Sequence, residues 1–220
     1  MPERRYPPNK EEIALFPPFA GLSLAKISVP SSSAEFDAAL ADLSHQRFIG
    51  FDTESRPVFR IGELSRGPHL LQLTTDNHAY LLQAFRPETK ALLEAILASR
   101  EIVKVGFGLE SDRADIARNF GIQIDAVLDL NAIFRRQGFT QTLGVKGAVA
   151  VVLQQKITKS KKVTMSNWAQ ARLQDNQLLY AANDAYAALK VLHALNLPAE
   201  QLPIHYLSRA IKSAPKTATP

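Results

Sequence analysis

The segment RFIGFDTE, residues 47–54, is the clearest structural signal in the chain, because it is an apolar run that ends in two carboxylates. It predicts a buried strand, and since side chains alternate along a strand, Asp52 and Glu54 share one face with Gly50. Carboxylates at i and i+2 lie roughly 6–7 Å apart at Cα, close enough to bind one metal ion or to bridge a pair. Gly50 leaves room on that face for a close neighbour. The alternative is a strand that simply ends in polar residues.

A further acidic segment, KVGFGLESD at residues 104–112, follows about 60 residues later. It predicts a strand and then a helix that ends at Gly121. Asp112 falls in the first turn of this helix, where a carboxylate also stabilises the helix dipole and the free N–H groups. Capping is therefore the alternative role for Asp112, and Glu110 and Asp115 are rival carboxylates.

The third segment is LLYAANDAY, within a helix expected from Asp175 to Leu195. Tyr180 and Asp184 are four residues apart and therefore lie on one helical face. A helical wheel places them on a flank lined by alanine and valine, and places Asn183 on the solvent side. An Asp on such a flank faces packed protein or a cleft. The alternative is a Tyr–Asp hydrogen bond that only braces one helical turn.

Acidic side chains beside apolar residues are costly unless their charge is compensated, and divalent metal ions compensate it well. Oxygen ligands without His or Cys favour Mg²⁺ or Mn²⁺ over zinc. Two such ions about 3.5–4 Å apart are the usual apparatus for in-line attack on a phosphodiester. The pattern therefore predicts a metal-dependent nuclease.

Composition sets the limits of this prediction. The chain has 220 residues, 46% hydrophobic and 21% charged, which is typical of a globular protein with one large domain. Its net charge of +5 suits a polyanionic partner but is weak evidence by itself. The absence of cysteine excludes disulfides, thiol catalysis and Cys-type zinc sites, and fits a cytoplasmic location. Neither a signal-peptide core nor a run of 18 apolar residues occurs, so no membrane association is expected.

Three parts are expected along the chain. Residues 1–22 form a proline-rich N-terminal arm, residues 23–200 form one domain, and residues 201–220 form a C-terminal segment that is disordered at its end. Strands that first meander and then alternate with helices predict a mixed α/β sheet covered by helices.

The order D-x-E, then Asp, then Y-x-x-x-D closely resembles the DEDD superfamily of 3′–5′ exonucleases, tyrosine subclass, which includes ribonuclease D and the Werner exonuclease. The resemblance extends from about Phe48 to Leu195. It implies a ribonuclease H-like exonuclease fold, with a mixed five-stranded sheet and helices on both faces. The first motif is then expected on a central strand and the last on a helix that crosses it.

The resemblance also implies the roles of individual residues. Two divalent metal ions, Mg²⁺ or Mn²⁺, would be bound by a set of four carboxylates, Asp52, Glu54, Asp112 and Asp184. Tyr180 would hold the water that attacks the terminal phosphodiester at the 3′ end of single-stranded or frayed DNA or RNA, releasing nucleoside 5′-monophosphates. Thr53, through its backbone, and Val58, as an apolar wedge, match positions that contact the terminal nucleotide. Ala114 stands where many relatives have a bulky aromatic.

The segment KITKSKK, residues 156–162, holds four lysines and suits either a loop that binds a nucleic-acid backbone or a solvated loop. The same two interpretations, a loop that binds a nucleic-acid backbone or a solvated loop, apply to Arg56, Arg60 and Arg66. Trp168 is expected to be a packing anchor. Two other functions stay open: a catalytically silent nucleic-acid-binding module, and an enzyme restricted to very short oligonucleotides. Nothing in the sequence indicates protein partners.

Overall fold

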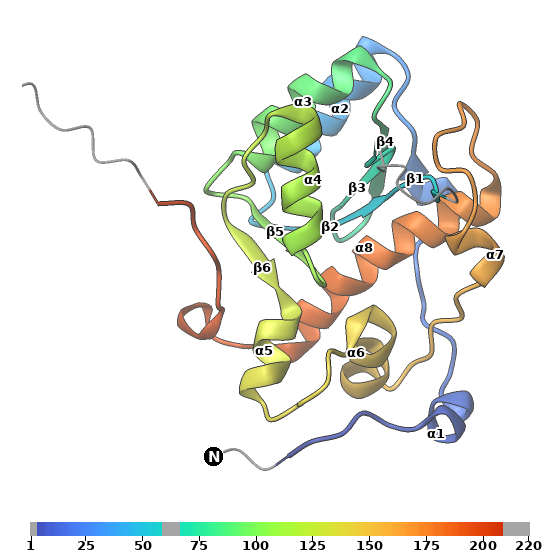
Figure 1. Ribbon diagram of the computed structural model, residues 1–220, viewed down its shortest axis with the longest axis vertical. Helices are drawn as coiled ribbons and strands as arrows, with labels where there is room; N and C mark the ends of the chain where they lie inside the picture. The colour runs from blue at the N-terminus through green and yellow to red at the C-terminus, as the bar shows by residue number, and fades with distance from the viewer. Residues whose placement is uncertain (1–3, 59–66, 209–220) are drawn as a thin grey trace, which may run out of the picture.

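The computed structural model describes residues 4–58 and 67–208, which form a mixed sheet between layers of helices (Figure 1). The sheet has six strands in the order β1-β4-β3-β2-β5-β6. Strands β2, β3 and β4 pair antiparallel and the other neighbours pair parallel. Their bounds are Ile27–Ser28 for β1, Phe48–Glu54 for β2, Leu70–Thr74 for β3, Ala79–Gln83 for β4, Val103–Gly106 for β5 and Val127–Asp129 for β6.

The predicted number of five strands is wrong. Strand β1 adds a sixth at the edge of the sheet, where Ile27 and Ser28 pair in parallel with Ala79 and Tyr80 of β4. The sequence AKISVP, residues 25–30, by itself reads as a strand, and of these residues only Ile27 and Ser28 pair in the sheet. The mixed sheet, the helices on both faces and the central position of β2 are as predicted.

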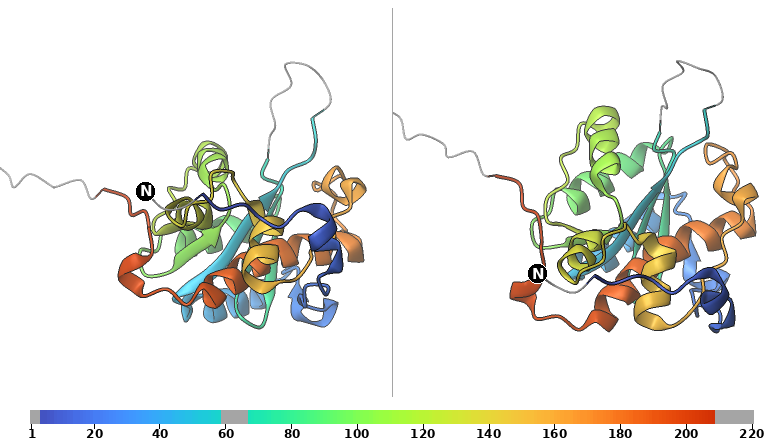
Figure 2. Two further views of the ribbon diagram at one scale, coloured as in Figure 1. Left: turned by 90° about the horizontal axis from the view of Figure 1, so that it is seen from below. Right: turned by 60° about the horizontal axis from the view of Figure 1, so that its bottom comes forward.

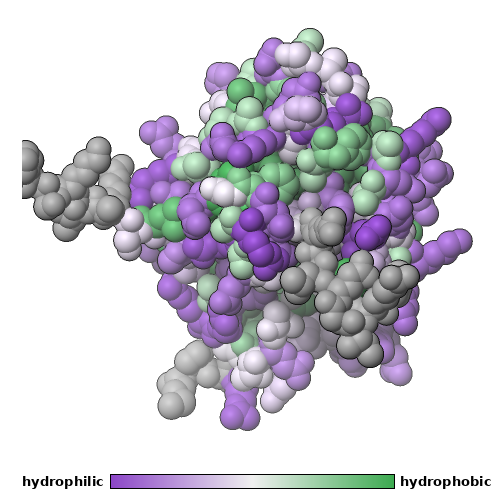
Figure 3. Space-filling model, turned by 45° about the horizontal axis from the view of Figure 1, so that its top comes forward, coloured by the Kyte–Doolittle hydropathy of each residue, from purple (hydrophilic) through white to green (hydrophobic). Residues whose placement is uncertain are grey.

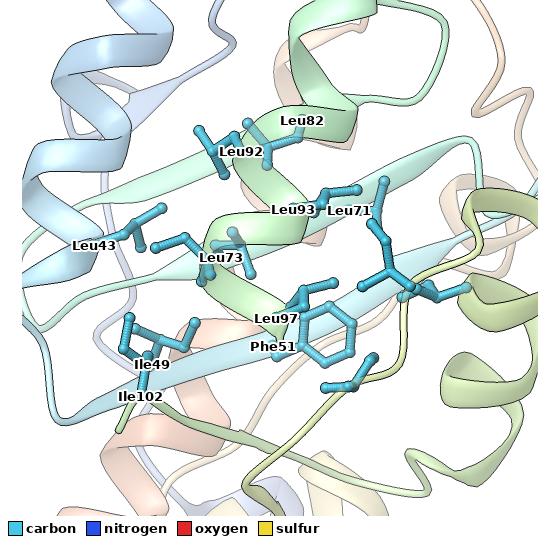
Figure 4. Packing of buried hydrophobic residues seen from close by; sticks show 14 of the residues in the cluster. Leu43, Ile49, Phe51, Leu71, Leu73, Leu82, Leu92, Leu93, Leu97 and Ile102 are labelled. Atoms are coloured by element: carbon cyan, nitrogen blue, oxygen red, sulfur yellow. The ribbon is translucent and has the colours of Figure 1, made fainter. Parts of the chain in front are cut away.

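One face of the sheet is covered by α2 (Ser33–Ser44) and α3 (Pro87–Leu97), with α4 (Glu110–Phe120) beside them (Figure 1). Figure 4 shows the apolar side chains of this layer. Their burial provides the hydrophobic free energy that holds the helices on the strands. The labelled residues are buried and include Leu43, Ile49, Phe51, Leu71, Leu73, Leu93 and Leu97.

The other face is crossed by α8 (Asp175–Leu195), whose bounds match the predicted helix, and α6 (Gly144–Leu153) packs beside it (Figure 1). Gly50 of β2 permits the crossing. A Cβ there would lie 2.1 Å from the carbonyl oxygen of Ala185 and 2.3 Å from Thr74 Oγ1. The backbone of α8 therefore lies directly against the strand that carries the first motif.

Local sequence signals explain where several helices begin and end. Ser32 caps α2 in a capping box with Glu35, and Pro87 occupies the first turn of α3. Gly121 ends α4 with a φ of 73°, a left-handed conformation that glycine adopts at little cost.

The N-terminal residues contain the short helix α1 (Lys10–Leu15) and run beside α6 (Figure 2). Backbone hydrogen bonds tie this segment to the domain. Phe19 N donates to the carbonyl of Lys156 at 2.9 Å, and Lys156 N donates to that of Pro17 at 2.9 Å. Asn183 was predicted to face solvent, but its Oδ1 accepts the N–H of Leu22 at 2.6 Å. The N-terminal arm covers this part of α8.

The remaining helices are short: α5 (Leu130–Arg136), α7 (Lys161–Thr164) and the 3₁₀ turns Leu24–Lys26 and Ala199–Gln201. Beyond the last turn, His205 N donates to the carbonyl of Val127 at 2.8 Å, so the chain reaches the edge strand β6. The predicted disorder, at the end of the segment 201–220, falls on residues that lie outside the described ones. Within the described residues, no helix is long and apolar enough to cross a membrane.

Lys104 of β5 is fully buried. Its ammonium donates to the carbonyls of Ser99 and Ile102, both at 2.7 Å, in the turn that follows α3. Burial lowers the pKa of Lys104 to about 7.

Candidate active site

The first two carboxylates lie on the central strand β2, on the face that α8 crosses. Asp52 lines a cavity of about 170 Å³ together with Gly106, Val145, Lys159 and Asp184. The cavity lies among β2, β5, α6 and α8. The Oδ1 atom of Asp52 accepts the N–H of Thr53 at 2.9 Å, which fixes the carboxylate beside its own strand.

Asp112 reaches the same region from the first turn of α4. Its Oδ1 accepts a hydrogen bond from the hydroxyl of Thr53. Of its two rivals, Glu110 is exposed and Asp115 pairs with Arg118. Asp112 is therefore the carboxylate of α4 that joins the group from β2. The side-chain role of Thr53 was not predicted, because the contact depends on how α4 packs against the strand.

Tyr180 and Asp184 lie on one face of α8, as predicted. Asp184 is buried, and Tyr180 is half-buried with its hydroxyl accepting from Thr164 Oγ1 at 3.1 Å. The Tyr180 ring centroid lies 5.8 Å from that of Trp168, which is 1% exposed. Trp168 is the packing anchor that the sequence predicted.

Lys159 is the member of the site that the sequence did not single out. Its Nζ lies 2.5 Å from Asp184 Oδ2 and 5.1 Å from the centroid of the Tyr180 ring. The side chain comes from the predicted lysine-rich segment 156–162. The only signal in the sequence was the local excess of lysine, which does not tell which ammonium enters the acidic cluster.

Burial and mutual repulsion raise the pKa values of the strand carboxylates. Burial, then Asp184 and Asp112, raise the pKa of Asp52 to about 8. Burial, then Asp52 and Asp184, raise the pKa of Glu54 to about 8. Burial also raises the pKa of Asp112. These shifts arise because several acids share one poorly solvated place, which favours a bound cation.

The pKa values of the two partners in the ion pair show how the buried lysine and the buried carboxylate affect each other. Burial raises the pKa of Asp184 although Lys159 and a hydrogen bond from Tyr180 act to lower it. Burial acts to lower the pKa of Lys159, but Asp184, Tyr180 and Asp52 outweigh it, and the pKa is raised. Lys159 therefore stays charged and supplies part of the compensating positive charge.

In the described ranges, 4–58 and 67–208, no three His, Cys, Asp or Glu side chains converge as a ready-made metal site. Two of the acids are engaged elsewhere, Asp184 with Lys159 and Asp112 with Thr53. The donor set still suits hard divalent ions, since it consists of carboxylate oxygens whose pKa values are raised first by burial and then by mutual repulsion.

The predicted substrate contacts are less clearly placed. Thr53 lies beside the cluster, with its N–H bonded to Asp52. Val58 is half-buried, four residues beyond the end of β2. Both remain predicted contacts. Arg60 and Arg66 lie outside the described residues.

Comparison with known proteins agrees with this geometry. A family model described as 3′–5′ exonuclease matches residues 27–199. The mouse "Bifunctional 3′-5′ exonuclease/ATP-dependent helicase WRN" is 28% identical over 179 residues, which cover 79% of this chain and 12% of that protein. The chain thus spans a small part of this relative.

Solved structures show the same fold. The Aedes aegypti Nibbler EXO domain superposes with a TM-score of 0.68 at 25% identity, over 80% of this chain and 89% of that one. Trypanosoma brucei RNase D in complex with RNA U12 superposes with a TM-score of 0.68 at 20% identity, over 89% of this chain and 68% of that one. Since the family model covers most of the sequence and its span includes the whole acidic cluster, this chain belongs to the 3′–5′ exonuclease family.

Proposed function

We propose that this domain is a metal-dependent 3′–5′ exonuclease that shortens DNA or RNA and releases nucleoside 5′-monophosphates. One observation carries the proposal. Carboxylates from three elements far apart in sequence, β2, α4 and α8, interact electrostatically, and two of them, Asp52 and Asp184, line one cavity against the sheet. A fold that serves only for binding has no need to place four mutually repelling acids in one poorly solvated region.

The four acids are the proposed ligands of two divalent ions, Mg²⁺ or Mn²⁺. Such ions, when bound, neutralise the phosphate and lower the pKa of the attacking water. Metal binding requires a rearrangement of the side chains, because the Lys159 ammonium lies 2.5 Å from Asp184 Oδ2. Lys159 is then free to turn toward the substrate, where a cation stabilises negative phosphate oxygens.

Tyr180 orients the attacking water in this proposal. Its pKa is raised above the usual value, chiefly by burial, so the hydroxyl stays protonated and acts as a hydrogen-bond partner. Water adds to phosphorus, the bond to the 3′ oxygen of the preceding nucleotide breaks, and that oxygen takes up a proton. The products are a nucleoside 5′-monophosphate and a strand with a new 3′ hydroxyl.

The proposed substrate is the 3′ end of a single-stranded or frayed nucleic acid. The family and the RNA bound to the Trypanosoma brucei relative support a nucleic-acid substrate. Thr53 and Val58 are the proposed contacts to the terminal nucleotide, and a cytoplasmic location remains the expectation from composition.

The test uses paired DNA and RNA strands, single- and double-stranded, with Mg²⁺ or Mn²⁺. Strands labelled at the 5′ end should shorten stepwise from the 3′ end and give mononucleotides. Internal cuts, or release that begins at the 5′ end, would contradict the proposed polarity. If no metal-dependent release occurs from any substrate, the catalytically silent binding module is favoured instead.

A series of substrates from two to twenty nucleotides separates the proposed enzyme from one restricted to very short oligonucleotides. The proposed exonuclease degrades the longer strands, whereas a restricted enzyme turns over dinucleotides and leaves longer strands intact.

A further inference from the structure

The positive charge of this chain is concentrated in one part of it. Residues 130–174 contain eight Lys and Arg and no Asp or Glu, whereas the whole chain carries a net charge of +5. The remaining residues are therefore net negative. This basic stretch includes α5, α6, the lysine-rich segment 156–162 and α7, and it adjoins the catalytic face of α8.

Part of this stretch forms a hollow with the N-terminal arm. The hollow has a volume of about 290 Å³ and is lined by four lysines, with Ile13 and Ala14 of α1 beside them. We call it the lysine hollow. Its lysines come from three segments: Lys10 of α1, Lys146 of α6, and Lys156 and Lys159 of the segment between α6 and α7. Among the described residues that line it, none is acidic.

The walls of the lysine hollow are held in place by hydrogen bonds. Lys156 Nζ donates to the carbonyl of Ala14 at 2.7 Å, and the Lys156 backbone pairs with residues 17–19 of the arm. Glu11 and Glu12, on the same helix as Lys10, do not line the hollow, and the carboxylate of Glu12 accepts the N–H of Asn9 at 2.7 Å. Lys10 and Lys146 are exposed, so both ammonium groups are accessible to a ligand.

The lysine hollow and the candidate active site share one lining residue, Lys159. This side chain lines both the hollow and the cavity that holds Asp52 and Asp184. Lys159 has an acidic partner in Asp184, but among the ion pairs of the described residues the other three lysines have none. Like charges gathered in this way repel one another, and a polyanion relieves that repulsion. The face shown in Figure 3, which looks onto the top of the molecule as drawn in Figure 1, carries hydrophilic areas with hydrophobic areas between them.

We propose that the lysine hollow binds the phosphate backbone of the substrate strand just upstream of the terminal nucleotide, which makes the N-terminal arm part of the substrate path. This rests on the proposed exonuclease function. The family model does not cover residues 1–26, so Lys10 would be a substrate contact from outside the matched exonuclease domain. Lysine contacts to phosphate give affinity without sequence preference.

The binding test compares Lys10→Ala/Lys146→Ala with the control Lys26→Ala/Lys90→Ala, which removes two exposed lysines that do not line the hollow. Both pairs are made in the Asp52→Asn background so that the strand is not consumed. Fluorescence anisotropy measures the affinity for single strands of two and twelve nucleotides. The hollow variant should bind the twelve-nucleotide strand roughly tenfold more weakly, with a salt slope shallower by about 1.4, since each lost contact to a single strand removes about 0.7.

The control should keep the affinity and the salt slope of the parent protein. Equal losses in the two pairs, equal losses for the two strand lengths, or no loss in the hollow variant would each overturn the proposal. Unchanged melting temperatures verify that both variants fold.

A kinetic measurement distinguishes this proposal from the proposed function. In the active protein, KM should fall as the strand lengthens, and the hollow variant should lose most of that fall. If the wild type releases no nucleotide, the proposed exonuclease function is refuted. The binding measurement still shows whether the lysine hollow binds the strand. If the wild type is active and the hollow variant keeps the full length dependence, only the hollow is refuted.

Discussion

Lys159 Nζ lies 2.5 Å from Asp184 Oδ2, so the acidic cluster of this exonuclease-family domain contains its own cation. Asp184 is 5% exposed and Lys159 is 24% exposed, so water screens the pair only weakly. Without the ammonium, Asp52, Glu54 and Asp184 would repel one another with less compensation. The same ammonium competes with any metal ion for the oxygen of Asp184.

Replacing Lys159 with Met should therefore destabilise the metal-free protein and strengthen its response to metal. Removing one partner of a buried ion pair costs about 3–5 kcal/mol, and the cost here should be nearer 1–3 kcal/mol because Asp184 can take up a proton. Melting temperatures with EDTA and with Mn²⁺ test this, with Lys162→Met as the matched exposed control. An equal rise on adding Mn²⁺ in wild type and Lys159→Met would contradict competition between lysine and metal.

Asp52→Asn and Asp184→Asn should both abolish nucleotide release but should differ in stability. Asp52→Asn removes a carboxylate whose pKa is raised by burial and by neighbouring acids, so the metal-free protein should melt at the same or a higher temperature. Asp184→Asn leaves Lys159 without its partner and should give no such gain. Both variants should lose most of the rise in melting temperature on adding Mn²⁺. A wild type indifferent to metal, or fully active variants, would remove these residues from the site.

The stability of the metal-free protein should fall as pH rises from about 5 to 8. The folded-state pKa values of Asp52 and Glu54 are about 8, above their ordinary values, so the folded state holds more protons than the unfolded state across this range. The free energy of unfolding then decreases with pH by at most about 1.4 kcal/mol per unit for each group. Thermal melts from pH 5 to 9 measure the slope, which Asp52→Asn should reduce and Mn²⁺ should reverse. If the Asp52→Asn variant keeps the slope of the wild type, the pH dependence of stability arises from other titratable groups.

Tyr180→Phe should lower kcat by roughly 10²–10³-fold, by analogy with removal of one transition-state hydrogen bond, with little change in metal affinity. The ring stays packed against Trp168, and the hydroxyl loses its hydrogen bonds with Thr164 and Asp184, so the melting temperature should change little. Thr164→Val is the matched control, since it removes the hydrogen bond from Thr164 but keeps the phenol. A variant with normal turnover and reduced stability would show that Tyr180 only braces the helix.

Gly50→Ala should destabilise the fold, because the added Cβ would lie 2.1 Å from the Ala185 carbonyl oxygen of α8. Overpacking of this kind costs about 1–3 kcal/mol or more, since backbone must move. Gly147→Ala in α6 is the control. Its Cβ meets only the Leu143 side chain, at 3.3 Å, and Ala favours the helix. Equal melting temperatures for the two variants would show that α8 does not depend on this close approach to β2.

Much of the fold, and the set of candidate site residues, could be predicted from the sequence, because both depend on local patterns. The alternation in residues 48–54, the first-turn proline at Pro87 and the periodicity of 175–195 act within a few residues of the chain, and they place the elements where the structure has them. The acids and Tyr180 were identified by their order and spacing, which a single sequence displays.

Only the tertiary structure decided which side chains meet across distant segments. Lys159 enters the acidic cluster, Asn183 lies under the arm, Lys104 is buried, and Lys10 joins Lys146 in one hollow. None of these contacts can be recognised from the spacing of residues in the sequence. Lysine and asparagine occur in the same sequence patterns whether their side chains are solvated or paired with another group. Their environment is set by the packing of α6, α8 and the arm against the sheet. Local patterns were thus sufficient for the helices, the strands and the candidate acids, whereas the electrostatic partners of those acids depend on how the layers pack.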